Sequence, residues 1–376
     1  MPVLKPLEGD AFATVLVNWQ KQHGRQSLPW QHTGDAYKVW LSEVMLQQTQ
    51  VSTVLGYYDR FLKAYPTVAD LAAAPEQDVM QLWAGLGYYS RARNLHACAK
   101  QVVERFGGQF PRTVAELESL PGIGQSTAGA IASLAHGVQA PILDGNVKRV
   151  FCRYYGIEGY PEQGAIKKAM WAIAARNVPS GQPGTYNQAL MDLGATCCTP
   201  RNPACGKCPI MQGCVALQQG RVQQLPTPKP KKPRPMLYFL SLLVSDEAGN
   251  LLLEPVDGQG VWQGLWTPPF IACDPQALPE DLQLQISDWV KQFGLNQYSK
   301  ALLQQSARLS SQPWLVHELT HRKMHFRHLH LQVSGVWEGF HPVHSKPVPA
   351  LVHKMLQQAQ AVSAQAAVPQ QDTLDF

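Results

Sequence analysis

A proline- and lysine-rich stretch divides this 376-residue chain into two parts with different hydrophobic periods. Residues 225–235 read Leu-Pro-Thr-Pro-Lys-Pro-Lys-Lys-Pro-Arg-Pro, which is typical of an extended basic linker. Before the linker, apolar residues recur with helical spacing and we find no strand pattern, whereas several later segments alternate. We therefore expect an all-α domain over residues 1–225, a linker at 226–235 and an α+β domain over 236–366.

Charge and hydropathy narrow the class of protein. The formal net charge is +5; Lys and Arg outnumber Asp and Glu before residue 236, and the reverse holds after it. A basic first part suits a polyanion, although so small an excess is also usual for a solvated surface. We find no apolar run of membrane-spanning length and no signal segment at the start, so we expect a cytoplasmic protein that does not contact a membrane.

A glycine hairpin followed by a carboxylate stands out in the helical part. Pro121-Gly-Ile-Gly124 predicts a tight turn that ends one helix and opens the next, where backbone N–H groups and the helix dipole favour a phosphate. The helix predicted over residues 126–136 is rich in small residues and is closed by Gly137. Asp144 follows in a short loop, so the pattern places a carboxylate beside a candidate phosphate site.

A second carboxylate lies inside an apolar helix. Asp35 can cap a helix predicted over residues 36–50, whose apolar residues surround the axis almost completely. Glu43 lies within it, and an unpaired carboxylate in such a place holds its proton unusually well. Capping boxes at Thr67 and Thr113 open further helices. Other helices are expected near residues 75–84, 91–106, 147–155, 165–176 and 185–193.

Four cysteines close the helical part in the array C-x6-C-x2-C-x5-C. They are Cys198, Cys205, Cys208 and Cys214. Four thiolates at such spacings can hold a zinc ion or a [4Fe-4S] cluster, and structural zinc usually comes with two C-x2-C pairs where this array has one. Disulfides are disfavoured by the absence of an export signal. The neighbouring Cys197 leaves the first position of the array ambiguous.

The hairpin, the helix after it and Asp144 resemble the helix-hairpin-helix DNA glycosylase superfamily, in which the hairpin grips the DNA backbone. The cysteine array is similar to that of the iron–sulfur branch of this superfamily. This resemblance implies a [4Fe-4S] cluster on the four cysteines, a six-helix part at about 27–136, and an iron–sulfur part made of 1–26 and 137–225. It also suggests that Arg201 and Lys207 meet DNA phosphates.

Three further motifs make the resemblance more specific. They are Ser42-Glu-Val-Met-Leu-Gln-Gln-Thr-Gln50, Gly85-Leu-Gly-Tyr-Tyr-Ser-Arg-Ala-Arg93 and Leu143-Asp-Gly-Asn-Val-Lys-Arg149. With the cysteine array, they look like the MutY family of adenine DNA glycosylases over nearly the whole chain. The family implies excision of adenine mispaired with 8-oxoguanine, and less efficiently with guanine, from double-stranded DNA.

The same resemblance suggests roles for single residues. Glu43 resembles the general acid that protonates the leaving adenine, and Asp144 the carboxylate that stabilises, or transiently bonds to, the sugar cation. Bifunctional relatives carry a lysine where this chain has Ser126, and a serine cannot form a Schiff base, so a monofunctional hydrolytic enzyme is implied. DNA-contacting positions match Gln48, Tyr88, Gly122, Gly124, Ser126, Lys148, Thr320 and His321. Without the resemblance, we would interpret Gln48 as a polar residue at the end of a helix and Tyr88 as an aromatic residue that packs against the hairpin.

The last third of the chain has strands expected at 236–245, 251–255 and 326–337, and helices at 281–293 and 350–366. Residues 260–266 resemble the entry to a Nudix-like fold, without the glutamate-rich metal box that hydrolysis needs. In the family this domain recognises the oxidised guanine through an aromatic-hydroxyl-His loop, matched here by Leu319-Thr320-His321, with leucine for the aromatic. His317 to His330 hold five histidines, so a metal or another register stays open, and His328 and His330 are expected to face solvent.

Two other functions remain in view. The first is an endonuclease III-type enzyme for oxidised pyrimidines, and Ser126 and the added C-terminal domain argue against it. The second is a non-catalytic iron–sulfur DNA-binding or redox protein, which would not need Glu43 and Asp144.

Residues 367–376 are expected to form a tail that ends in Gln371-Asp-Thr-Leu-Asp-Phe376. This end resembles the peptide that docks repair proteins on the bacterial sliding clamp, and an unordered tail or a packing strand is the alternative. We expect a monomer.

Overall fold

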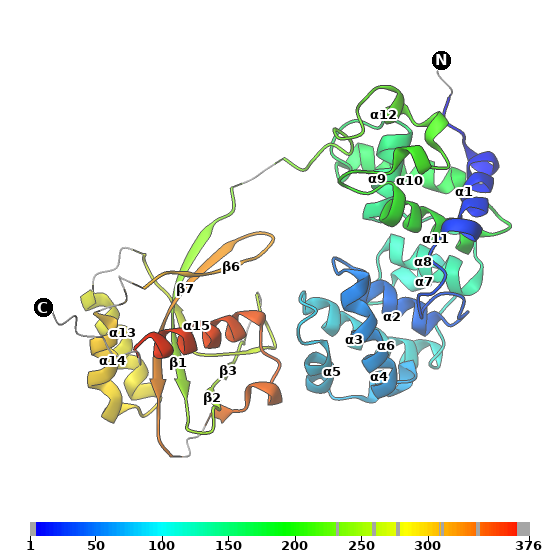
Figure 1. The fold of residues 1–376 in the computed structure, drawn as a ribbon. Coiled ribbons are helices and arrows are strands. Elements are labelled where there is room, and N and C mark those ends of the chain that lie inside the picture. Colours follow the sequence, from blue (N-terminus) through cyan, green and yellow to red (C-terminus); the bar gives the residue numbers. More distant parts are fainter. Residues whose placement is uncertain are drawn as a thin grey trace, which may run out of the picture. The chain divides into compact units, whose positions relative to one another are not determined.

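The computed structural model describes the chain except for several short segments (Figure 1). The described residues are 5–230, 233–257, 261–275, 279–307, 309, 312–335 and 339–366. Contacts divide the chain into two compact units, residues 1–82 with 90–231 and residues 83–89 with 232–376. No helix among the described residues is long and apolar enough to cross a membrane.

The first unit is helical, as the apolar spacing predicts, and residues 5–230 contain no strand. Its helices are α1 (Gly9–His23), α2 (Ala36–Leu46), α3 (Val51–Ala64), α4 (Val68–Ala73), α5 (Glu76–Trp83), α6 (Ser90–Phe106), α7 (Val114–Glu118), α8 (Gln125–His136), α9 (Gly145–Tyr154), α10 (Gly164–Asn177), α11 (Pro183–Asp192) and α12 (Val215–Gln218). Short turns η1 (Leu193–Cys197), η2 (Cys205–Lys207) and η3 (Met211–Gly213) lie among the cysteines.

The helix ends follow their capping residues. The Asp35 carboxylate accepts a hydrogen bond from the Tyr37 N–H at 2.9 Å, and Thr67 and Asp70 form a reciprocal capping box. Gly137 closes α8 with a φ of 66°, the left-handed conformation that glycine adopts without steric cost. The predicted starts of α2 and α4 and the end of α8 are therefore confirmed.

Helix α2 is shorter than its sequence pattern indicates. It was predicted to reach Gln50, but it ends at Leu46. The reason is tertiary, because the buried guanidinium of Arg91 on α6 binds the carbonyl groups at this end of the helix.

Aromatic side chains fill the core beside the cysteine region. Phe12 of α1 is fully buried, and its ring centroid lies 5.0 Å from that of Tyr154 and 6.4 Å from that of Phe151, both on α9. Burying each such side chain stabilises the fold by about 1.5–3 kcal/mol. This packing fixes α9, whose first turn carries the candidate site, against the N-terminal helix.

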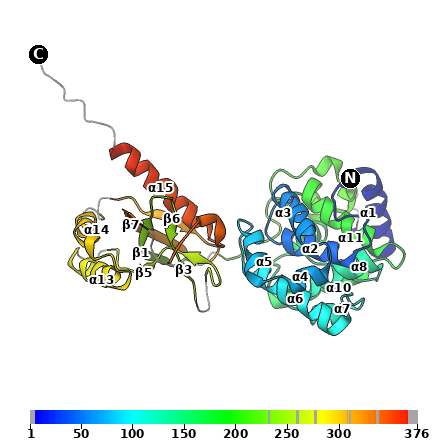
Figure 2. The same cartoon turned by 90° about the horizontal axis from the view of Figure 1, so that it is seen from below.

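The second unit holds a mixed sheet with helices on both faces. Its strands are β1 (Met236–Ser245), β2 (Leu251–Leu252), β3 (Glu254–Pro255), β4 (Trp266–Thr267), β5 (Phe270–Ala272), β6 (Leu315–Glu318), β7 (Lys323–Gln332) and β8 (Phe340–His341). The main sheet has the order β6-β7-β1-β2-β8, with β1 and β7 parallel and the other pairs antiparallel. Helices α13 (Pro279–Gln292) and α14 (Ser299–Ser306) pack on one face, and α15 (Ala350–Ala366) lies on the other (Figure 2).

Some elements of this unit differ from the sequence prediction. Strand β7 begins at Lys323 and ends at Gln332, instead of running over 326–337, and helix α14 was not predicted at all. The parallel pairing with β1 explains the register of β7, because it matches Met236 with Lys323 and Ser245 with Gln332. Such long-range pairing leaves no local signal in the sequence.

The prediction that His328 and His330 face solvent is wrong. His328 is only 6% exposed and His330 is half-buried, because β7 is an internal strand and both of its faces are covered. Burial lowers the pKa of His328 to about 4, so its imidazole is neutral at physiological pH.

Candidate functional site

A pocket of about 630 Å³ opens in the helical unit between α1, α2, α8 and α11. This volume is within the range of small-molecule sites. Its lining includes Gln20, Trp30, Glu43, Ser133, Gln182 and Gln188. The pocket therefore contains one of the two predicted catalytic carboxylates.

Glu43 is the one acidic residue of α2, a helix that is buried nearly all round. Its neighbours Ser42 and Val44 are 1% and 4% exposed, while Glu43 itself is half-buried and lines the pocket. Burial and, second, the like charge of Asp144 raise the pKa of Glu43 from 4.5 to about 7. The carboxyl group therefore holds its proton at a pH where an ordinary glutamate has lost it, which suits a general acid.

Asp144 is the N-cap of α9. Its Oδ1 accepts a hydrogen bond from the Val147 N–H at 2.8 Å, and its Oδ2 accepts one from the Asn146 side-chain amide at 3.2 Å. Burial is the largest influence and raises the pKa of this carboxyl above its usual value, and both hydrogen bonds and the nearby Arg149 oppose that rise. The site therefore has two carboxyl groups in different surroundings, Glu43 lining a pocket and Asp144 at a helix N-terminus whose hydrogen bonds counter the effect of burial.

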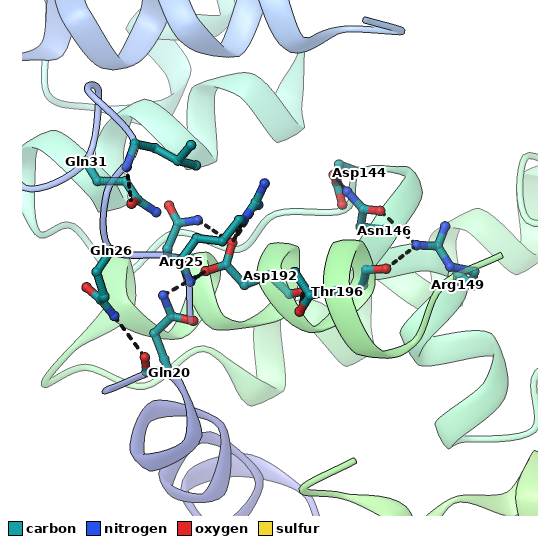
Figure 3. A network of polar contacts seen from close by, with 12 residues as sticks. Gln20, Arg25, Gln26, Gln31, Asp144, Asn146, Arg149, Asp192 and Thr196 are labelled. Carbon is teal, nitrogen blue, oxygen red and sulfur yellow. Dashed lines mark hydrogen bonds and ion pairs between the residues drawn. The ribbon is translucent and has the colours of Figure 1, made fainter. Parts of the chain in front are cut away.

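A chain of hydrogen bonds leads from Asp144 toward the cysteines (Figure 3). The guanidinium of Arg149 donates to the Asn146 side-chain oxygen at 2.8 Å and to the backbone oxygens of Gly194 and Cys198, each at 2.7 Å. Asn146 is therefore held from both sides. Arg149 therefore ties the Asp144 loop to the start of the cysteine loop.

Helix α8 supports the loop before Asp144 from the other side. The Ser126 hydroxyl accepts a hydrogen bond from the Leu143 N–H at 3.0 Å. At Gly129 a Cβ atom would lie 2.1 Å from the Pro141 backbone oxygen, so only glycine lets the loop approach this closely. The small residues of α8 thus have a structural reason, and Ser126 lies one hydrogen bond from the residue that precedes Asp144.

The predicted phosphate hairpin has the expected geometry. Gly122 has a φ of 76°, and Gly124 is the exposed N-cap of α8 and offers no capping side chain to its first turn. Lys148, another predicted DNA contact, forms an ion pair with Glu162. An anion could therefore reach the N–H groups of α8 directly, while Lys148 would have to exchange its carboxylate partner for a phosphate.

Gln48 and Tyr88 share an uncommon backbone conformation. Their φ angles are 58° and 49°, in the left-handed region where residues with side chains are uncommon, and both are exposed. Such strain costs about 1–3 kcal/mol and occurs preferentially at functional sites. It supports the prediction that both residues do more than pack.

Arg91 holds the Gln48 segment in place, and the sequence analysis missed it. Its guanidinium is buried and donates to the carbonyl oxygens of Val44, Met45 and Gln47 at 2.9, 2.9 and 2.7 Å, and to the Thr49 hydroxyl at 3.1 Å. A cation at this position satisfies the last carbonyls of α2. No local pattern predicts these partners, because they lie more than 40 residues away.

A second missed feature is the buried carboxylate of Asp192 on α11 (Figure 3). It forms an ion pair with Arg25 at 2.6 Å and accepts hydrogen bonds from the side-chain amides of Gln20 and Gln188, both at 2.9 Å. Both glutamines line the pocket. Asp192 is an acidic residue in the apolar run 189–193. The reasoning used for Glu43 could therefore have drawn attention to it from the sequence.

The four predicted cluster ligands surround one cavity. Its lining includes Cys198, Cys205, Cys208 and Cys214, together with Cys197 and Arg153. Arg153 is 3% exposed, and its guanidinium donates to the Cys198 sulfur at 3.4 Å and to the Thr199 carbonyl oxygen at 2.8 Å. Four thiolates carry a large negative charge, so a buried cation beside them fits a [4Fe-4S] cluster. When bound, a cluster would cross-link residues 198–214.

In the second unit, Thr320 and His321 occupy the tip of the turn between β6 and β7. The Leu319 N–H donates to the Arg322 carbonyl oxygen at 2.9 Å, which closes the turn and leaves both tip residues exposed. His317 and His325 are half-buried, so His321 is more accessible than either. The Nudix-like motif begins at Gly260, which lies outside the described residues, and its Trp262 is buried.

Family comparisons identify the class of protein that this fold and site define. Residues 41–176 match the HhH-GPD superfamily of base excision DNA repair proteins, and residues 198–214 match the iron–sulfur binding domain of endonuclease III. The solved structure of a thermostable thymine-DNA glycosylase is 31% identical, covers 56% of this chain and 96% of its own, and has a TM-score of 0.51. The helical unit is thus a helix-hairpin-helix DNA glycosylase with an iron–sulfur loop, and the [4Fe-4S] prediction is confirmed.

Relatives identify the family within that class. An adenine DNA glycosylase of Buchnera aphidicola subsp. Schizaphis graminum is 34% identical over 358 residues, which is 92% of this chain and 98% of the relative. The human adenine DNA glycosylase is 47% identical over 227 residues, 58% of this chain and 41% of the relative. The chain belongs to the adenine DNA glycosylase family.

Proposed function

We propose that this enzyme excises adenine mispaired with 8-oxoguanine, and less efficiently with guanine, from double-stranded DNA, and that it does not cut the strand. The observation that carries the proposal is the electrostatic coupling of Glu43, in the pocket, with Asp144, at the N-terminus of α9. Hydrolysis of a glycosidic bond needs an acid for the leaving group and a negative charge for the sugar cation.

The two carboxylates divide this chemistry. Glu43, with its raised pKa, donates a proton to the adenine ring in the pocket, so that the base leaves as a neutral molecule. Asp144, which accepts hydrogen bonds from Val147 and Asn146, would in its ionised form stabilise the positive charge that develops on the sugar. Water then completes the hydrolysis.

Ser126 supports a monofunctional enzyme. A lyase needs an amine that attacks the sugar and forms a Schiff base, and a hydroxyl group cannot do so. The Ser126 hydroxyl is engaged instead with the Leu143 N–H, next to Asp144. We therefore assign it a supporting role in the hydrolytic site.

DNA binding is proposed at the exposed, strained and glycine-rich positions. Gly122 and Gly124 would hold a phosphate at the start of α8, and Lys148 would hold another. Gln48 and Tyr88 would enter the duplex as the base leaves the stack, since extruded bases are replaced by inserted side chains. Their left-handed backbone conformation supports this role.

We further propose the domain organisation predicted from the sequence: a glycosylase domain at 1–225, a linker at 226–235 and a Nudix-like recognition domain at 236–366. Thr320 and His321 would contact 8-oxoguanine, a proposal supported by their exposure at a tight turn. Docking of Gln371–Phe376 on the sliding clamp concerns a segment outside the described residues and stays a proposal, as do the monomeric state and the cytoplasmic location.

Strand cleavage of a duplex with one A:8-oxoguanine pair tests the function. We expect strand breaks only after hot alkali, because hydrolysis leaves an abasic site. Breaks without alkali would indicate a lyase of the endonuclease III type, and no breaks in either case would indicate a DNA-binding protein. Glu43→Gln should lose activity, while Glu104→Gln, at an exposed position on α6, is the matched control and should retain it.

A further inference from the structure

The pocket that holds Glu43 also contains an amide oxygen with no hydrogen-bond partner. Gln20 of α1 lines this pocket and is 4% exposed, and its Oε1 forms no hydrogen bond within the described residues. A buried acceptor without a donor is uncommon in folded proteins, because it loses its hydrogen bonds to water and gains none in return. The oxygen of Gln20 can therefore accept a hydrogen bond from a group that enters the pocket.

The orientation of this amide is set by Asp192, whose side chain is fully buried. The Asp192 Oδ2 accepts hydrogen bonds from the Gln20 Nε2 at 2.9 Å and from the Arg25 N–H at 2.8 Å. Its Oδ1 accepts from the Gln188 Nε2 at 2.9 Å and from the guanidinium of Arg25 at 2.7 Å (Figure 3). An ionised carboxylate only accepts hydrogen bonds, so each glutamine must turn the nitrogen end of its amide toward it. The oxygen of Gln20 is thus the end that faces away from Asp192.

Packing restrains the same amide. A Cβ atom at Gly24 would lie 2.2 Å from the Gln20 Oε1, so the amide packs directly on the main chain just after α1. Turning the amide over would also replace its bond to Asp192 with an oxygen that faces a carboxylate. The pocket therefore has an acceptor of fixed orientation.

An acceptor of fixed orientation distinguishes between bases of the same size. Adenine carries an amino group on its six-membered ring, which donates hydrogen bonds. Hypoxanthine has the same bicyclic ring with a carbonyl oxygen at this position, which only accepts. The amino group gains a hydrogen bond from the amide oxygen, whereas two oxygens that face each other repel and leave both acceptors unpaired.

We infer that Asp192 is a positioning residue for base selection: it keeps the Oε1 of Gln20 as the acceptor for the amino group of the extruded base and thereby favours adenine over hypoxanthine. This role rests on the proposed function, because it requires that the pocket receives the base. Asp192 does not line the pocket, so it acts through the amide and not by contact with the base.

Asp192→Asn in the full-length protein tests this role. The asparagine oxygen should stay beside the guanidinium of Arg25, which places its amide nitrogen opposite the Gln20 nitrogen and forces Gln20 to turn over. The measurement is single-turnover release of adenine and of hypoxanthine, each opposite 8-oxoguanine in the same duplex. The intrinsic stability of each glycosidic bond cancels when the ratio of the two rates is compared between variant and wild type. We expect the preference for adenine to fall by roughly tenfold or more.

Two further variants make the test specific. Asp59→Asn also removes an ion pair, with Lys63 at 2.8 Å on the exposed face of α3, and as the matched control it should leave the ratio unchanged. Asp192→Asn combined with Gln20→Glu restores the negative charge and an acceptor that cannot turn into a donor, because asparagine can donate to one glutamate oxygen while the other faces the base. The preference for adenine should then return toward the wild-type value.

Three results would overturn the inference. One is an active Asp192→Asn variant that releases both bases more slowly by the same factor, and another is a double variant that does not recover the preference. If Asp192→Asn does not fold, Gln20→Met, which has no amide, decides: a lost preference supports the role, and a wild-type ratio contradicts it. A wild type that releases no adenine opposite 8-oxoguanine would refute the proposed function and this role together, whereas an unchanged ratio in an active variant refutes the role alone.

Discussion

Raising the pH should switch off base release by removing the proton of Glu43. Because its pKa is about 7, the carboxyl group titrates within the range where most proteins stay folded. Only the protonated form can donate to the leaving adenine, so the single-turnover rate should fall as the pH rises through this value. This direction is opposite to that expected if Glu43 acted as a base.

The expected size of the effect follows from the titration curve. With a pKa of about 7, roughly half of Glu43 is protonated at pH 7 and about one-tenth at pH 8, with a further tenfold loss for each pH unit. Bound DNA brings additional negative charge, which raises the midpoint in the complex. Asp144→Asn removes the like charge and should lower the pKa of Glu43 in the free protein, as measured by carbon NMR of the carboxyl groups.

The assay is single-turnover release of adenine from a duplex that the enzyme saturates, between pH 6 and 9, with alkali added after quenching. Glu43→Gln should be slower by roughly 10²–10⁴-fold and should show no decline above pH 7, because the amide has no proton to lose there. A wild-type rate that stays constant from pH 6.5 to 9, with DNA binding unchanged, would remove Glu43 as the general acid.

Three other substitutions test separate parts of the site. Ser126→Lys supplies the missing amine and should allow borohydride to trap a covalent DNA complex, whereas robust trapping by the wild type would contradict the hydrolytic assignment. Gly194→Ala would place a Cβ atom 2.5 Å from the Cβ of Asn146, so base release should slow at least tenfold while the protein keeps its iron. Gly206→Ala is the control, because a Cβ atom there would have nothing within 4 Å. Equal rates for the two variants would show that Asn146 does not position Asp144. His321→Ala should reduce the preference for 8-oxoguanine over guanine by about 1–3 kcal/mol, and an unchanged ratio would mean that another residue reads the lesion.

Local patterns predicted the helical part well and drew attention to its two carboxylates. Apolar spacing identified α2 and α8, and a charged residue among apolar ones drew attention to Glu43. The coupling of Glu43 with Asp144 could not be predicted from spacing alone, because the two residues come from helices far apart in the sequence. The same holds for Arg91, whose partners on α2 precede it by more than 40 residues and cause the helix to end early.

Errors in the second unit have a related cause. The alternation of polar and apolar residues along β7 predicted that His328 faces solvent, because one face of such a strand is often exposed to solvent. The strand instead lies inside the sheet, between β6 and β1, and both of its faces are covered, so its polar residues are also largely removed from solvent. Helix α14 is only eight residues long, too short for its apolar pattern to stand out from the loops around it.

The raised pKa of Glu43 is a cost that the rest of the fold must offset. Between pH 4.5 and 7 the folded chain holds a proton that the unfolded chain has released, so this group makes a contribution to stability that falls as the pH rises. Above pH 7 the loss of unfolding free energy caused by this group approaches about 3 kcal/mol. The loss is smaller where the side chain remains partly exposed to the pocket. The left-handed residue at Gln48 adds about 1–3 kcal/mol of strain on the same segment. Arg91 binds the carbonyl oxygens of Val44, Met45 and Gln47, which lie between these two residues, so its stabilising contacts lie where the candidate site is most costly to the fold.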